Sequence, residues 1–265
     1  MFLATLIGIL LTLCGPAGAG VNRAVLGAVY VDPTPGAVLP LQLNFRDDSG
    51  KTWSLKNALG NRPSVLIFAD YTCHTLCGPI LDFTAAALEK SGLKPGADYR
   101  LIVIGIDPKD GLNTARAMKT SHLDHDEPIT RASLFLTGSK AAIDKATSTL
   151  GYHFVYDAEH DQFAHPAAVF VLTRDGKVTR VLSGIGLNGG DLRLALVEAG
   201  QGQIGTLTDR FRLLCYGYDP ALGIYTARIN FLLNASCIFT LVIMLAGFLV
   251  MHRLARARAR ARTAR

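Results

Sequence analysis

Residues 64–79 read SVLIFADYTCHTLCGP and join a strongly apolar run to two cysteines. The apolar part, residues 64–69, is typical of a buried strand, and residues 80–89 are typical of a helix. Cys73 and Cys77 therefore stand where a strand ends and a helix begins. In a helical turn, positions i and i+4 share a face, so the two sulfurs could close a disulfide or bind one soft metal ion. A helix N-terminus also lowers the pKa of a thiol, which favours the thiolate that both chemistries need.

Strand patterns alternate with helical patterns through residues 40–200. The predicted strands lie at 41–45, 51–55, 64–69, 99–106, 133–136, 152–156, 167–172 and 177–182. The predicted helices lie at 55–59, 80–91, 112–121, 140–150 and 189–199. This alternation, followed by a late hairpin and a terminal helix, indicates an α/β domain of three layers around a mixed sheet. The stretch is long enough to bury one sizeable core.

The N-terminal segment is typical of a secretory signal. Residues 2–13 are almost wholly apolar, and Ala17 and Ala19 suit a signal-peptidase site. We therefore interpret residues 1–19 as a signal peptide, with a retained N-terminal anchor as the alternative. Residues 20–39 are rich in glycine and proline and predict an extended lead-in outside the core.

The C-terminal segment is typical of a membrane anchor. The apolar run at 231–251 would reach about 30 Å as a helix, so we predict a transmembrane helix at 229–251 after a packed juxtamembrane linker at 201–228. The tail at 252–265 holds six arginines and no acid, while the whole chain is formally +6. Acids and bases therefore balance outside the tail, which argues against nucleic-acid binding. An arginine-rich flank marks the cytoplasmic side, so the domain is expected on the opposite side, in the periplasm of a bacterium.

The periplasm is an oxidising compartment, which bears on the five cysteines. Cys14 leaves with the predicted signal, and Cys237 lies in the predicted membrane helix. A disulfide between Cys73 and Cys77 would close a very short loop and stabilise weakly, so a functional pair is the favoured interpretation. Cys215 is interpreted as a buried residue, with an extra soft ligand or a redox partner as the alternative.

Thiolates are ligands for soft metal ions, and imidazole is a common further ligand at such sites. Among the histidines, His74 directly follows the first cysteine of the pair and is a candidate ligand or a base that depresses a thiol pKa. His122 and His125 have a spacing that metal sites use, although a polar helix end is the favoured interpretation.

Several motifs together resemble the Sco/SenC family. They are Tyr71-Thr72-Cys73 with Cys77, the segment 106–110, the segment 135–138, and His165 ahead of the segment 170–176. This family comprises thioredoxin-like copper proteins that help to assemble the copper centre of cytochrome c oxidase. The resemblance covers about residues 40–200 and implies a thioredoxin-like mixed sheet flanked by helices.

The resemblance also implies a copper site, Cu(I) or Cu(II), on Cys73, Cys77 and His165. Family members usually have a proline after each cysteine, whereas this chain has His74 and Gly78.

The sequence and the resemblance together predict a membrane-anchored periplasmic copper-binding protein. It would deliver copper during assembly of the cytochrome c oxidase copper centre, as a metallochaperone rather than an enzyme. The expected partner is an oxidase subunit or another copper protein, and the expected location is the bacterial inner membrane with a cytoplasmic tail. The alternative is a thiol–disulfide oxidoreductase in which Cys73 attacks and Cys77 resolves, reducing the copper-ligand cysteines of a partner protein.

Overall fold

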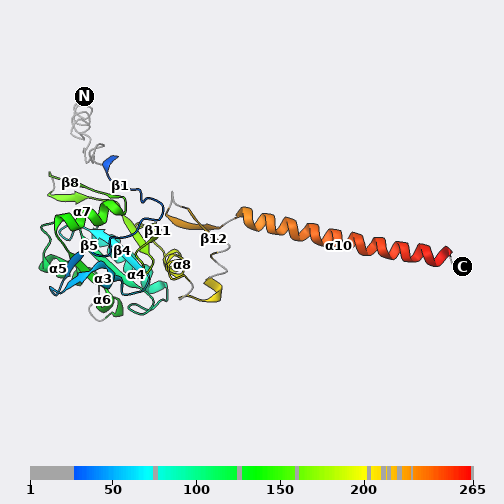
Figure 1. Ribbon diagram of the computed structural model, residues 1–265, viewed down its shortest axis with the longest axis horizontal. Coiled ribbons are helices and arrows are strands. Elements are labelled where there is room, and N and C mark those ends of the chain that lie inside the picture. The colour runs from blue at the N-terminus through cyan, green and yellow to red at the C-terminus, as the bar shows by residue number, and fades with distance from the viewer. Residues whose placement is uncertain are drawn as a thin grey trace, which may run out of the picture.

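The computed structural model combines an α/β domain with one long C-terminal helix (Figure 1). The structure describes residues 27–73, 77–123, 127–158, 161–201, 204–209, 213, 216–219, 223–227 and 229–263. The predicted signal peptide at 1–19 and the residues Cys14, His74, His125 and Cys215 lie outside this described part.

A seven-stranded mixed sheet forms the centre of the domain, in the order β11-β10-β4-β5-β6-β2-β3. Strands β4, β5 and β6 pair in parallel, and every other pairing in this sheet is antiparallel. The strands are β2 (Asn44–Asp47), β3 (Thr52–Ser54), β4 (Ser64–Ala69), β5 (Arg100–Gly105), β6 (Leu134–Thr137), β10 (Ala168–Leu172) and β11 (Val178–Ser183). The predicted mixed α/β architecture is therefore confirmed.

Helices cover both faces of this sheet, and the sheet separates the core into two halves. The helices of the domain are α3 (Leu55–Leu59), α4 (Cys77–Lys90), α5 (Leu112–His122), α6 (Pro128–Ala132), α7 (Lys140–Thr149) and α8 (Gly189–Ala199). Alternate residues of β4 serve the two halves: Val65 and Ile67 pack with residues of α4, α5 and α8, whereas Leu66 and Phe68 pack with residues of α3 and α7. All six residues of β4 are buried, so both faces of this strand are covered by the core.

The first hairpin begins later in the chain than its alternating pattern predicts. The carbonyls of Leu41 and Leu43 accept hydrogen bonds from the backbone N–H groups of Lys56 and Leu55, at the start of α3. Because these carbonyls serve the helix N-terminus, the strand begins only at Asn44.

The predicted strand at 152–156 is divided into two. Its first part, β7 (Tyr152–His153), pairs with β1 (Tyr30–Val31), and its second part, β8 (Val155–Asp157), pairs with β9 (Gln162–Ala164). The strand β9 was not predicted, and it leads directly to His165.

The sequence predicted that the lead-in at 20–39 lies outside the core, but the end of this segment belongs to the core. Ala37 and Leu39 are buried, because the segment docks on the turn between β10 and β11. There Leu39 donates its N–H to the carbonyl of Gly176, and Val178 donates to the carbonyl of Ala37.

The C-terminal part contains a hairpin and then α10 (Ile229–Thr263), which extends away from the domain in Figure 1. The hairpin, β12 (Tyr216–Asp219) and β13 (Ile224–Ala227), lies within the predicted linker. In α10, the stretch Ser236–Arg253 has a mean hydropathy of 1.8 and buries nothing against the protein. Within the described part of the chain, α10 is the one helix long and apolar enough to cross a membrane.

Candidate metal centre

The turn after β4 is organised by a fully buried carboxylate. Asp70 Oδ1 accepts hydrogen bonds from the N–H and the hydroxyl of Thr72, at 2.9 Å and 2.8 Å. Its other oxygen, Oδ2, accepts from the N–H of Phe163 in β9 at 3.0 Å, and its carbonyl accepts from the N–H of Cys73 at 3.2 Å. Asp70 thus shapes the turn and also connects it to a segment 93 residues away.

The structure brings Cys77 and His165 into direct contact. Cys77 is the first residue of α4 and is only 2% exposed, and its Sγ lies 2.7 Å from Nε2 of His165. Cys73 is partly exposed and packs against the same core. Neither cysteine is in a disulfide bond. The three predicted ligands therefore gather at the carboxyl end of β4, two of them in contact across 88 residues of sequence.

The electrostatic environment favours neutral forms of Cys77 and His165. Hydrogen bonding with Cys73, and then burial, raise the pKa of the Cys77 thiol far above its ordinary value. Loss of solvent lowers the pKa of His165, against the opposing effect of the Pro166 carbonyl. At neutral pH, Cys77 therefore retains its proton and His165 is an uncharged imidazole, the form in which a histidine binds metal.

The observed contact is a hydrogen bond rather than a preformed metal geometry. Using zinc bond lengths as a guide, about 2.3 Å to sulfur and about 2.0 Å to nitrogen, a tetrahedral angle would separate two ligand atoms by about 3.5 Å. Consistently, no three His, Cys, Asp or Glu side chains of the described residues form a ready metal site. Binding of a metal ion must therefore increase the distance between Sγ and Nε2 from 2.7 Å to about 3.5 Å, and it must displace the Cys77 proton. The donor set of two thiols and one neutral imidazole nevertheless suits a soft ion.

Gly78, which replaces the usual family proline, is explained by His122. A Cβ added at Gly78 would lie 2.6 Å from Nε2 of His122, so the imidazole occupies the space that any side chain would need. His122 ends α5, and its Nδ1 lies 2.9 Å from Oδ1 of Asp82 in α4. His122 therefore joins two helices, as a polar helix end.

The neighbouring Tyr71 anchors the other side of the turn. Its hydroxyl lies 2.9 Å from the carbonyl of Val103 and 3.0 Å from that of Leu136. Its N–H donates to Oδ2 of Asp110 at 3.3 Å, and burial raises the pKa of Asp110 to about 7.

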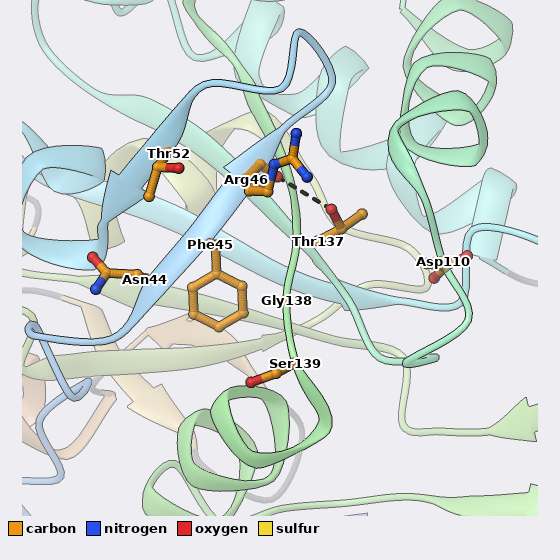
Figure 2. Close-up of a pocket in the computed structure, with 8 residues that line it drawn as sticks. All are labelled: Asn44, Phe45, Arg46, Thr52, Asp110, Thr137, Gly138 and Ser139. Atoms are coloured by element: carbon orange, nitrogen blue, oxygen red, sulfur yellow. Dashed lines mark hydrogen bonds between the residues drawn. The ribbon is translucent and has the colours of Figure 1, made fainter.

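Asp110 also lines an open cavity of ≈ 410 Å³ (Figure 2). It is lined by Asn44, Phe45, Arg46, Thr52, Asp110, Thr137, Gly138 and Ser139. Figure 2 shows the Phe45 ring standing between β2 and the Gly138–Ser139 segment. No thiol or imidazole lines this cavity, so it offers none of the ligand types found at the candidate site of Cys73, Cys77 and His165.

Sequence reasoning missed Tyr152, which appeared only as the start of a strand. Its hydroxyl lies 2.9 Å from Nδ1 of His165. The contact between Tyr152 and His165 depends on the pairing of short strands and on the fold as a whole, so a local sequence pattern could not predict it.

Comparisons with known proteins agree with this geometry. The sequence profile of the family described as SCO1/SenC matches residues 36–188. A search of curated proteins found no significant match.

Solved structures with the same fold include three that are informative. A candidate electron transfer protein from Aquifex aeolicus VF5 is 23% identical, with a TM-score of 0.56 over 62% of this chain and 93% of its own. A SCO1/SenC family lipoprotein from Bacillus anthracis str. Ames is 21% identical, with a TM-score of 0.50 over 59% of this chain and 92% of its own. Arabidopsis thaliana ScoI, solved with copper bound, is 17% identical, with a TM-score of 0.50 over 63% of this chain and 98% of its own.

Proposed function

Because this chain belongs to the SCO1/SenC family, we propose that it is a membrane-anchored copper carrier that holds one copper ion on Cys73, Cys77 and His165. The observation that carries the proposal is the 2.7 Å contact between Cys77 Sγ and His165 Nε2, with Cys73 beside them. The copper bound to Arabidopsis thaliana ScoI supports the choice of metal.

In this proposal copper is the cargo of the protein, so the three side chains must both bind the ion and release it to a recipient. Two thiolates favour Cu(I), and the imidazole also accommodates Cu(II). Cys73 is the partly exposed ligand, so it is the first to meet an incoming ion and the first to be exchanged for a ligand of the recipient. The recipient in this proposal is a cytochrome c oxidase subunit or another copper protein with soft ligands.

The proposed location is supported by α10 and the arginines at its end. In this proposal α10 crosses the inner membrane of a bacterium, the arginine-rich tail is cytoplasmic, and the domain faces the periplasm after removal of residues 1–19. The mean hydropathy of Ser236–Arg253 and its complete exposure support the spanning helix. The arginines that follow support the orientation.

Copper titration tests the site directly. The full-length reduced chain in detergent micelles is titrated with Cu(I) against a competing chelator, beside the variants Cys73→Ser, Cys77→Ser and His165→Ala. We expect one copper per wild-type chain and a loss of affinity of at least about 100-fold in each variant, beyond the 10–100-fold typical of outer-shell changes. Cys237→Ser, which alters an exposed cysteine of α10, is the matched control. Stoichiometric binding that survives all three substitutions would eliminate the site.

A thiol–disulfide oxidoreductase is the second candidate function, favoured by the hydrogen bonding between the two thiols. The thiolate of the accessible Cys73 would attack a partner disulfide and release one partner thiolate. Cys77 would then lose its proton and attack the mixed disulfide, forming the Cys73–Cys77 disulfide, and the second partner thiolate that is released would take up a proton. Two electrons would pass to the partner.

Trapping of a mixed disulfide distinguishes this second function. Cys77→Ser should accumulate a mixed disulfide with a peptide that carries an oxidised pair of copper-ligand cysteines, and Cys73→Ser should not. Absence of the adduct, together with no reduction of the peptide by the wild-type chain, would exclude the reaction.

A further inference from the structure

The side chain of Tyr152 places a hydroxyl group against the far side of the His165 imidazole. Tyr152 is 2% exposed, and its Oη lies 2.9 Å from Nδ1 of His165, 3.0 Å from the Pro166 carbonyl and 3.4 Å from the Phe68 carbonyl. The phenol ring packs against the rings of Phe68 and Phe170, at centroid distances of 4.8 Å and 6.0 Å. Packing therefore fixes the hydroxyl in place, independently of its hydrogen bonds.

The hydrogen-bond partners restrict how protons can be arranged along this cluster. If Nδ1 carries the ring proton, it donates to Tyr152 Oη at 2.9 Å, with the Pro166 carbonyl as a second, longer acceptor at 3.2 Å. The Tyr152 hydroxyl then donates to the Pro166 carbonyl, and the Nε2 lone pair faces Sγ of Cys77. If Nε2 carries the ring proton instead, the bare Nδ1 faces the Pro166 carbonyl at 3.2 Å, and these two acceptors have no proton between them. In the first arrangement, both the Nδ1–H of His165 and the hydroxyl of Tyr152 have an acceptor.

We propose that Tyr152 is the positioning residue of this site: its buried hydroxyl receives the Nδ1–H of His165 and so directs the Nε2 lone pair at Cys77. The inference rests on the proposed function for its purpose, since Nε2 is then the nitrogen presented to copper. Metal-binding histidines generally give their second ring N–H to such a partner, which fixes the tautomer and the ring orientation. Here the partner is a neutral phenol, which orients the ring without adding a charge to a buried site.

The test removes one oxygen atom and keeps the aromatic ring. Tyr152→Phe is compared with wild type and with Tyr156→Phe, the matched control. The Tyr156 hydroxyl pairs with Asp161 at an exposed position and has no hydrogen bond to His165. The full-length reduced chain, labelled with ¹⁵N in its seven histidines, is studied in micelles without metal. The ¹⁵N shifts distinguish a protonated from a bare ring nitrogen, and His165→Gln assigns the signals of His165.

We expect the wild-type His165 to be protonated at Nδ1 and bare at Nε2. In Tyr152→Phe, the His165 signals should shift toward a mixture of tautomers, and Cu(I) affinity should fall by about 10–100-fold. Tyr156→Phe should change neither measurement.

The outcomes separate this inference from the proposed function. A wild-type His165 protonated at Nε2 overturns the inference, and this measurement decides the matter even if Tyr152→Phe fails to fold. Unchanged His165 shifts and unchanged copper affinity in a folded Tyr152→Phe also overturn it. A wild-type chain that binds no copper but shows the expected tautomer, lost in Tyr152→Phe, refutes the copper carrier and upholds the positioning role.

Discussion

Asp70 is the residue on which the geometry of the candidate site depends most. Its two carboxylate oxygens accept three hydrogen bonds, two from Thr72 beside it and one from Phe163 near His165. An ionised carboxylate has acceptors only, so it matches three donors without conflict. This one side chain therefore holds the cysteine turn and the histidine segment at a fixed separation.

Replacing Asp70 with Asn should disrupt this arrangement. The amide NH₂ would face either the N–H of Phe163 or the donors of Thr72, leaving buried donors unsatisfied at a cost of about 1–3 kcal/mol. We expect a lower free energy of unfolding by that amount and weaker copper binding. Chemical denaturation and Cu(I) titration measure the two effects. Asp107→Asn, which alters a turn carboxylate that accepts from Lys109 N–H, serves as the control. Wild-type stability in Asp70→Asn would contradict the role given to this carboxylate.

Asp110 makes the stability of the domain depend on pH. Burial raises its pKa to about 7, so the folded state binds this proton more tightly than the unfolded state does. The stabilisation from this group is fully present below the ordinary value of 3.8 and is lost as the pH rises through about 7.

Asp110→Asn should therefore stabilise the protein at pH 8 and change little at pH 4. An amide oxygen can still accept the Tyr71 N–H, and the buried charge is removed. The gain at pH 8 is at most about 4 kcal/mol, from 1.36 kcal/mol for each pKa unit. Denaturation of both proteins at the two pH values isolates this group, because the other carboxylates titrate in both. A difference that is the same at pH 4 and pH 8 would refute the raised pKa.

Among the secondary-structure elements, β4 and α4 were predictable and β9 was not. The apolar run of β4 is continuous because the strand is buried on both faces, and the helical pattern after it is regular. The strand β9 has three residues, all only partly buried, and exists through its pairing with β8 and the bond to Asp70. Local propensity therefore predicted α4, although with a start at residue 80 rather than at Cys77, but it did not predict the strand that precedes His165.

The contact between α4 and α5 gives a prediction about helix packing. Gly78→Ala should destabilise the protein by about 1–3 kcal/mol, because the new methyl group would overlap the His122 ring. In a His122→Ala background the same change should be neutral or stabilising, since alanine is the better helix former by about 1 kcal/mol. A double-mutant cycle of unfolding free energies measures the coupling. Additive effects would show that the imidazole does not restrict this position.

At the scale of the whole molecule, the described residues between the domain and α10 include two that are hydrogen-bonded to the domain. Arg193 in α8 makes two hydrogen bonds to the buried carboxylate of Asp209, at 2.8 Å and 2.7 Å. The N–H of Ser183, at the end of β11, donates to the carbonyl of Gly223 at 3.4 Å. The domain that carries the site is thereby tied to the chain that leads to α10.

The orientation of α10 is the last prediction, and it decides whether the site can meet a periplasmic partner. Because arginines are retained on the cytoplasmic side, green fluorescent protein fused after Arg265 should fluoresce in a bacterial cell. Alkaline phosphatase, which is active only after export, should be inactive at the same position and active when fused after residue 227. Replacing the six tail arginines with alanine should reduce the fluorescent fraction without changing the length of the helix. Active phosphatase at the C-terminus would contradict the cytoplasmic tail. Together with inactive phosphatase after residue 227, it would place the domain in the cytoplasm and remove the basis for a periplasmic copper carrier.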